Sequence, residues 1–177
     1  FLQDKNYLAK VETEKLEVST NITKFFSKKD IAKELKRIQS GMDLSSDFIK
    51  KLSMNEARTN MMIEKTIIEN KDKNNKIIIF AGSVESAKNI NLILKMENIN
   101  CALVTGETNL LERRTNIEKF KDAKSGLNII INYGVLTTGF DAPKANVAII
   151  GRPTQSVTLY SQMVGRVMRG KKAGGKK

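Results

Sequence analysis

The sequence predicts an α/β fold, in which an open parallel β-sheet is flanked by helices. Four short and almost wholly apolar runs occur from residue 76 onward, as expected for strands buried on both faces of a parallel sheet. Segments whose apolar residues recur at helical spacing lie between the first three runs and after the fourth. With 40% hydrophobic residues, a chain of 177 residues can bury a real core. We expect right-handed crossovers between the strands.

The N-terminal part of the sequence is predicted to form an arm followed by a helix. Residues 7–20 contain β-favouring Val and Thr without clear alternation, and they fit either a strand or an extended arm. A capping-box-like pattern begins at Ser27, with Asp30 three residues later, and apolar residues then recur at helical spacing up to Gly41. We therefore expect a first helix to end near Gly41.

A second helix is expected from Ser53 to about Asn70, because Ser53 and Glu56 again resemble a capping box. The polar run 70–75 then predicts a loop. We place a boundary there, between an extended arm with linker helices at 1–75 and a main domain at 76–177.

The main domain is predicted to alternate strands and helices. The expected strands are residues 76–81, 101–104, 128–131 and 147–150. The expected helices are residues 84–96, a helix that begins at Asn109, and residues 156–168. No internal repeat is visible.

The charge of the chain is concentrated at its C-terminal end. The net charge is +12, yet the stretch from Ala142 to Lys177 contains eight Lys or Arg and no Asp or Glu. Such a surface is typical of proteins that bind phosphate, in nucleotides or nucleic acid. No 18-residue apolar run is present, which disfavours a membrane protein.

Residue usage excludes several kinds of chemistry. The chain has no histidine, so Ser-His-Asp and Cys-His catalysis and every His-containing zinc site are excluded, and we assign no metal ligands. Its one cysteine, Cys101, lies in an apolar run, fits a core position and excludes an intrachain disulfide. We expect a reducing, cytoplasmic location. The chain begins at Phe1 with no signal peptide, which predicts a piece of a longer protein.

Three loops are predicted to lie at the carboxyl ends of the strands, where open α/β sheets bind ligands. The loop at 81–83 ends in a helix cap at Ser83, which fits a phosphate site or an ordinary cap equally well. The loop at 104–108 contains Gly106 and is a weak signal by itself. The loop at 134–143 is the most informative, because it combines two hydroxyls, a glycine and an acid: Thr137, Thr138, Gly139 and Asp141.

The last predicted helix carries an unusual polar face. Gln162, Gly165, Arg166 and Arg169 recur at helical spacing and would share one side. A second row, Leu159, Met163 and Val167, would pack inward. A glycine inside a helix costs about 1 kcal/mol relative to alanine, which close approach at Gly165 or a ligand for the arginines would offset. A solvated basic face is the simpler alternative.

These motifs together resemble those of superfamily 2 helicases. Four stretches carry the resemblance. Residues 76–83 resemble motif IV, and Gly106 with Arg113 and Phe120 resembles motif IVa. Residues 135–143 resemble motif V, and residues 152–169 resemble motif VI. The run of motifs V and VI is most similar to the RadD-like DNA repair group of DEAD/DEAH-type helicases. The resemblance implies a RecA-like domain, the second motor domain of a P-loop NTPase.

The resemblance also implies roles for individual residues. By position, Arg169 would be the arginine finger, Arg166 a second γ-phosphate contact and Gln162 their positioning partner. Gly139 and Asp141 would couple the nucleotide to nucleic acid. The backbone of nucleic acid would be held by Ser83, Gly106, Thr137 and Thr138.

Part of such a motor is missing from this sequence. It contains no G-x-x-x-x-G-K-[ST] and no D-E-x-H run. The resemblance therefore implies that ATP and Mg²⁺ are held mainly by an N-terminal RecA-like domain of the same full-length protein, and that residues 1–177 alone hydrolyse no ATP. The expected partners are this domain and DNA, with RNA as an alternative. The expected process is DNA repair or restriction.

Two other functions stay open at this point. The first is a non-catalytic nucleic-acid-binding α/β module, which would not need an arginine face beside Asp141. The second is a self-sufficient nucleotide-binding domain, which the missing phosphate loop disfavours.

Overall fold

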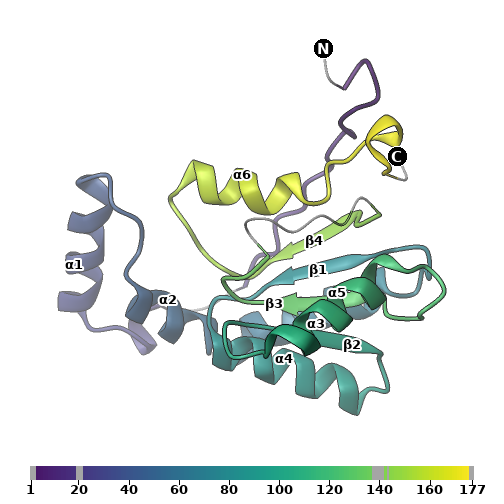
Figure 1. Ribbon diagram of the computed structural model, residues 1–177. Coiled ribbons are helices and arrows are strands. Elements are labelled where there is room, and N and C mark those ends of the chain that lie inside the picture. The colour runs from purple at the N-terminus through teal and green to yellow at the C-terminus, as the bar shows by residue number, and fades with distance from the viewer. Residues whose placement is uncertain (1–2, 19–21, 137–141, 143, 176–177) are drawn as a thin grey trace.

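The computed structural model describes residues 3–18, 22–136, 142 and 144–175. Four strands form one parallel sheet in the order β2-β3-β1-β4. Their bounds are β1 Ile77–Phe80, β2 Cys101–Val104, β3 Ile129–Asn132 and β4 Val147–Ile150. In register, Ile77 of β1 lies opposite Ile129 of β3 and Val147 of β4. Each strand lies within about one residue of its predicted place, and the parallel α/β fold is confirmed (Figure 1).

Helices cover both faces of the sheet. Helices α3 (Glu56–Glu69) and α4 (Val84–Met96) lie on one face, where Met62 and Ile90 pack against Ile77, Ile79 and the rest of that side. Helices α5 (Leu110–Lys121) and α6 (Val157–Gly165) cover the other face through Phe120 and Met163. Because both faces are covered, the central strands β1 and β3 are wholly buried, as their apolar sequences predict.

The N-terminal helices form a projecting hairpin, whose base contacts the loop after β1 and the start of α4. A short 3-10 helix (Ile22–Lys24) leads into α1 (Lys28–Gln39), and the Ser27–Asp30 capping box is present as predicted. Helix α2 (Ser46–Ser53) follows. The rings of Phe26 and Phe48 stack with centroids 4.0 Å apart, which closes the hairpin. In Figure 1, α1 stands away from the sheet while α2 leads back to it.

The sequence prediction for residues 42–56 was wrong in detail. It missed α2 and started a helix at Ser53, whereas Ser53 is the last residue of α2. Asn55 caps α3 instead, since its side chain accepts a hydrogen bond from the Arg58 N–H at 3.0 Å. The predicted boundary at residue 75 stays a prediction, and α3 on its N-terminal side packs on the sheet.

The last helix is shorter than predicted. It ends at Gly165 rather than Met168, and Arg166 is its C-cap. The next residues pair with the N-terminal arm instead: the Ala9 N–H donates to the Met168 carbonyl at 2.8 Å, and the Gly170 N–H donates to the Tyr7 carbonyl at 3.0 Å. These bonds hold the backbone in an extended form, so the helix cannot continue. A 3-10 helix (Lys171–Ala173) follows.

Two buried residues, one of them charged, carry reactive side chains into the core. Lys76 is 3% exposed, and its ammonium donates to the carbonyls of Leu127 at 2.7 Å and Asp122 at 3.1 Å and lies 5.5 Å from the centroid of the Phe120 ring. Cys101 is buried and free, as predicted, and burial raises the pKa of its thiol. A buried lysine with such partners fastens β1 to the turn after α5.

Candidate functional site

The loop between β1 and α4 is built around close packing. Ser83 is 4% exposed, and its hydroxyl accepts a hydrogen bond from the Ser86 N–H at 3.1 Å, so it is the helix cap. A Cβ added at Gly82 would lie 2.6 Å from the Cβ of Ser53 in α2. Glycine is therefore required here by the approach of α2. The nucleic-acid role of Ser83 stays a prediction beside this structural role.

The loop between β2 and α5 is held by internal hydrogen bonds, and its outer side is exposed to solvent. Arg113 Nη2 donates to the carbonyls of Thr105 at 3.1 Å and Thr108 at 3.2 Å, and the Thr108 hydroxyl accepts from the Thr105 N–H at 2.9 Å. Gly106 is exposed, and no heavy atom lies within 4 Å of a Cβ built on it. The loop therefore offers an accessible stretch of backbone, which suits a sugar-phosphate contact.

The most informative predicted loop lies largely outside the described residues. Thr137, Thr138, Gly139 and Asp141 are all in this group. Its base is described: Asn132, wholly buried at the end of β3, donates from Nδ2 to the Ile79 carbonyl at 3.0 Å and accepts from the Leu136 N–H at 3.4 Å. The structural role of Asn132 was not predicted, although a polar residue at the end of an apolar strand could have indicated it.

The predicted polar face of the last helix is only partly present. Gln162 is on α6 and Arg166 caps it, both half-buried, whereas Arg169 lies beyond the helix in a β-bridge with Leu8. The prediction that Gln162, Gly165, Arg166 and Arg169 share one helix face was therefore wrong for Arg169. The inward row is confirmed, because Met163 is wholly buried and Leu159 and Val167 pack beside it. Space beside Gly165 is open among the described residues.

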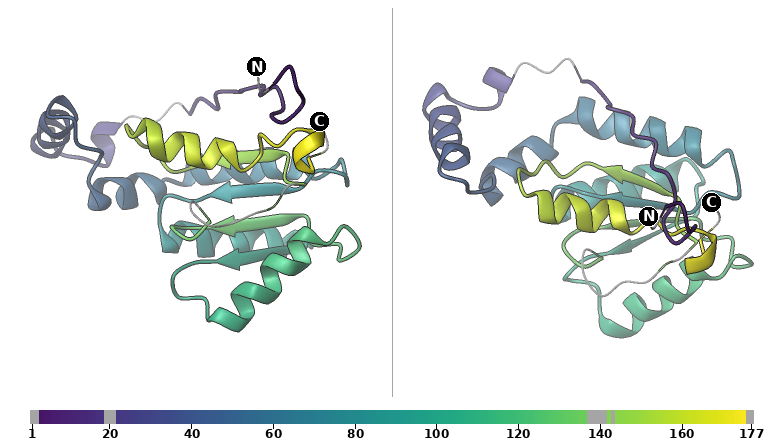
Figure 2. Two further views of the ribbon diagram at one scale, coloured as in Figure 1. Left: turned by 45° about the horizontal axis from the view of Figure 1, so that its top comes forward. Right: turned by 90° about the horizontal axis from the view of Figure 1, so that it is seen from above.

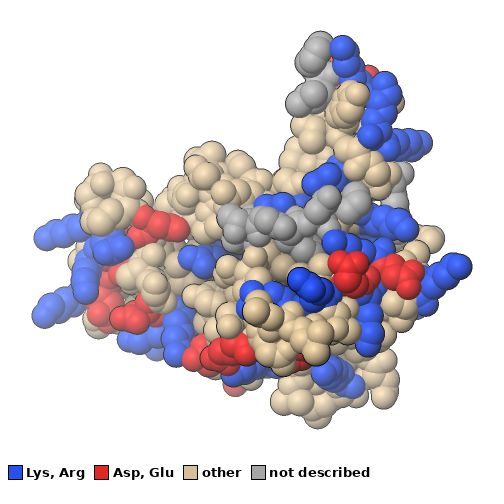
Figure 3. Space-filling model, viewed as in Figure 1, with Lys and Arg blue, Asp and Glu red and all other residues tan. Residues whose placement is uncertain are grey.

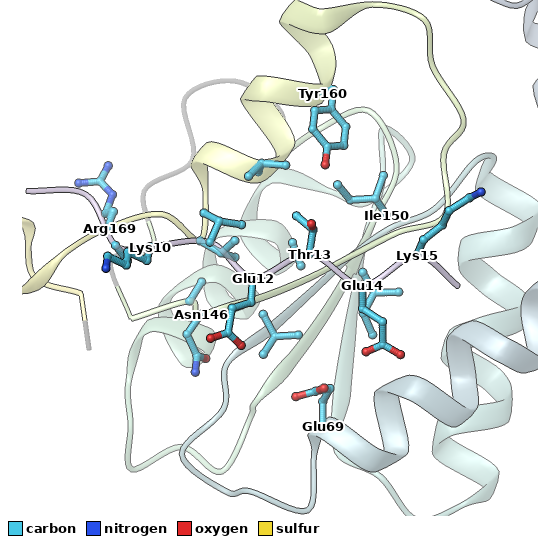
Figure 4. A pocket seen from close by; sticks show the side chains of 18 of the residues that line it. Lys10, Glu12, Thr13, Glu14, Lys15, Glu69, Asn146, Ile150, Tyr160 and Arg169 are labelled. Atoms are coloured by element: carbon cyan, nitrogen blue, oxygen red, sulfur yellow. The ribbon is translucent and has the colours of Figure 1, made fainter. Parts of the chain in front are cut away.

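Arg169 lines a large cleft between the N-terminal arm and the edge strand. The arm runs past β4 and α6 (Figure 2), and the cleft of about 1210 Å³ lies between residues 8–16 and β4. In Figure 4, Arg169 and Lys10 lie at one end of the cleft and Tyr160 points toward it from α6. Lys65 of α3 holds the arm through Glu14 at 2.6 Å. Within the described residues, β4 pairs only with β1, so its outer edge faces this cleft.

Basic side chains gather near the two ends of the chain. Figure 3 shows Lys and Arg over the projecting part formed by the N-terminal arm and the C-terminal tail. The sequence contains no acid after Asp141, but the fold supplies one from far away: Asp43 lies against Thr154 and Gln155. This approach was not predicted, because a contact between residues more than 100 positions apart leaves no local pattern.

The fold is a parallel α/β domain, in which the described loops follow the carboxyl ends of the strands. Residues 57–171 match the helicase conserved C-terminal domain, which is more than half of the chain. The chain belongs to this family, and it is a RecA-like C-terminal domain of the superfamily 2 type.

Similar proteins agree with this assignment. The chain is 32% identical over 118 residues to IRC3 of Saccharomyces cerevisiae, named as an ATP-dependent helicase, and the match covers 66% of this chain and 17% of that protein. It is 25% identical over 99 residues to the pre-mRNA-processing ATP-dependent RNA helicase PRP5 of Lodderomyces elongisporus, covering 56% and 10%. The chain thus spans less than a fifth of either relative.

Among the solved structures with a similar fold is one from a restriction enzyme. It is a fragment assigned to the HsdR subunit of a type I restriction enzyme from Vibrio vulnificus, with a TM-score of 0.56 and 24% identity, covering 71% of this chain and 26% of that one. At this identity the similarity concerns the fold alone.

Proposed function

We propose that this chain is the second motor domain of an ATP-driven helicase or translocase. Membership of the helicase C-terminal family carries the proposal, together with two arginines that closely follow α6. A triphosphate is well held by planar, always-charged guanidinium groups, which Arg166 and Arg169 supply, and the neutral Gln162 amide adds further N–H donors. ATP and Mg²⁺ would be held mainly by an N-terminal RecA-like domain of the same protein.

In this proposal the residues act across a cleft between the two motor domains. Arg169 stabilises the charge that develops on the γ-phosphate, Arg166 contacts the same phosphate, and Gln162 orients them. Ser83, Gly106, Thr137 and Thr138 contact the nucleic-acid backbone, and Gly139 and Asp141 link the two sites.

The nucleic acid is proposed to be DNA, in repair or restriction, and the setting cytoplasmic. The similarity of motifs V and VI to those of the RadD-like DNA repair group supports DNA. The name of PRP5 keeps RNA as the alternative. Within the part of the chain that the structure describes, no helix is long and apolar enough to span a membrane.

The arginine role is tested by kinetics of the full-length protein. Arg169→Ala should lower kcat for ATP by roughly 10³-fold at saturating nucleic acid, with nucleotide affinity almost unchanged, because the contact strengthens only in the transition state. Arg169→Lys should restore little, since an ammonium lacks the planar fork. Lys171→Ala is the matched control. Equal kcat in wild type and Arg169→Ala would refute the proposal.

A further inference from the structure

Asp43 joins the projecting hairpin to the segment that precedes α6. It lies in the turn between α1 and α2, far in sequence from its partners. Its Oδ2 accepts a hydrogen bond from the Thr154 hydroxyl at 2.7 Å, and its Oδ1 accepts from the Gln155 N–H at 2.7 Å. Both bonds are short and charge-assisted, which makes them stronger than bonds between neutral groups.

The contact continues into the first turn of α6. The Thr154 hydroxyl gives its single hydrogen to Asp43, and its oxygen accepts from the Ser156 N–H at 3.0 Å. Ser156 is the cap of α6, and its hydroxyl accepts from the Leu159 N–H at 3.2 Å. Three consecutive residues before the helix are thereby held in one arrangement. The carboxylate also lies near the positive end of the helix dipole.

Asp43 is itself held in place. Its Oδ1 also accepts from the Leu44 N–H at 2.9 Å, and its carbonyl accepts from Arg37 Nη2 at 3.3 Å. Burial alone would raise the pKa of Asp43, but the bonds from Gln155, Thr154 and Leu44, with the nearby charge of Arg152, hold it below its usual value. The carboxylate is therefore charged at neutral pH.

The hairpin also contacts the loop and the helix that follow β1. The Cβ of Ser53, at the end of α2, fills the space that a side chain at Gly82 would need, and Lys50 of α2 pairs with Glu85 of α4 at 2.6 Å. Arg58 of α3 donates to the Gly151 carbonyl at 3.4 Å, just after β4. The path from the sheet through α2 to Asp43 and on to α6 is thus continuous.

We infer that Asp43 is a positioning residue, which holds residues 154–156 and thereby sets the place of α6 and of the arginines that follow it. The carboxylate contacts this segment and not the phosphate. It would therefore affect ATP hydrolysis only by setting the position of α6. The inference rests on the proposed function for its consequence in ATP hydrolysis, but the anchoring itself is independent of ATP.

The anchoring is tested by hydrogen exchange of the full-length protein without nucleotide. In Asp43→Asn, and in Thr154→Val, which keeps the side-chain shape, amides of Gln155 and the first turn of α6 should exchange about tenfold faster or more. Amides of α4 should be unchanged, which shows that the domain stays folded. Asp47→Asn, the same change on the exposed side of α2, should exchange like wild type. Unchanged exchange at Gln155 in Asp43→Asn would overturn the inference.

The consequence for the motor is tested by separating kcat from KM in the same variants. Misplaced arginines should lower kcat for ATP about tenfold at saturating nucleic acid, while KM for ATP stays within about twofold. Faster exchange with an unchanged kcat would overturn the positioning of the arginines. Failure of the proposed function is recognised separately, by an Arg169→Ala variant with wild-type kcat. In that case the exchange measurement alone decides whether Asp43 anchors α6.

Discussion

At the scale of single residues, two glycines that look alike in sequence have opposite structural roles. Both follow a strand end, but a Cβ built on Gly82 would lie 2.6 Å from the Cβ of Ser53, whereas no described heavy atom lies within 4 Å of one built on Gly106. Neither has a positive φ, so backbone strain does not separate them. The difference lies only in what packs against each position.

This difference gives a stability prediction. Gly82→Ala should lower the free energy of unfolding by about 1–3 kcal/mol, because the added methyl group overpacks a junction where Ser53 is 2% exposed. Gly106→Ala, the matched control, should change it by no more than about 0.5 kcal/mol. Urea denaturation of the two variants measures this. Equal stability of both would contradict the packing described at Gly82.

At the same scale, sequence reasoning identified residues whose role depends on a local pattern. Ser83 was predicted as a cap because it precedes an apolar helical repeat, and the Ser86 N–H confirms it. Asp43 and Asn132 were missed because their roles depend on partners on other elements. Arg169 was placed on a helix because the spacing allowed it, while the competing backbone bonds come from residues 7–9.

At the scale of elements, a buried carboxylate joins the two helices of the hairpin, α1 and α2. Glu34, 6% exposed, accepts from the Ser45 hydroxyl at 2.5 Å and the Ser45 N–H at 2.9 Å, and Ser45 caps α2. Burial acts to raise the pKa of Glu34, but these bonds and the charge of Arg37 leave it lowered. The hairpin therefore prefers the ionised form.

The sign of this shift predicts an acid weakening of the hairpin. A pKa that folding lowers adds stability above the unfolded value, about 4.3 for Glu, and the gain is lost as pH falls through the folded value. Amides of α1 and α2 should therefore lose protection below about pH 4, after correction for intrinsic exchange. Glu34→Gln should remove the share of this pH dependence that Glu34 contributes and leave the shares of Asp30 and Asp43, whose pKa values are also lowered. The exposed control Glu56→Gln should leave the whole pH dependence unchanged. Equal protection of the α1 and α2 amides from pH 7 to pH 3 in the wild type would contradict this prediction.

The elements also mark the limit of prediction by pattern. The four strands were located because a short, continuous apolar run between polar loops is typical of a strand buried on both faces of a sheet. Helix α2 was missed because it has only eight residues, and the Ser53 to Glu56 pattern after it was a more complete helix start. The true cap of α3, Asn55, lies between those two residues.

At the scale of the whole molecule, the excess of basic residues predicts how the chain meets nucleic acid. Binding should be weak, independent of sequence and strongly reduced by salt, because each phosphate that a Lys or Arg neutralises releases about one counterion. Fluorescence titration of a single strand at several salt concentrations measures the slope. Tight, base-specific or salt-indifferent binding would contradict the proposed backbone contacts.

The sequence as a whole also predicts that this part of a motor does not hydrolyse ATP by itself. Residues 1–177 contain no phosphate-binding loop, so they should not hydrolyse ATP even when nucleic acid is bound. A steady-state ATPase assay of this chain, beside the full-length protein, checks the expectation. Nucleic-acid-stimulated turnover by the chain alone would show that it is not half of a motor.

The buried ammonium of Lys76 has a consequence for chemical labelling. Acylating reagents attack the neutral amine of a lysine that solvent can reach, and Lys76 is 3% exposed, with two main-chain carbonyls and an aromatic ring around its nitrogen. Lys88, whose side chain is 54% exposed, pairs with the exposed Glu107 at 2.6 Å, so reagent can reach it from solvent. Acylation at Lys76 therefore requires β1 to separate from the turn after α5, and the ratio of adducts at Lys76 and Lys88 reports how often the core of the domain opens.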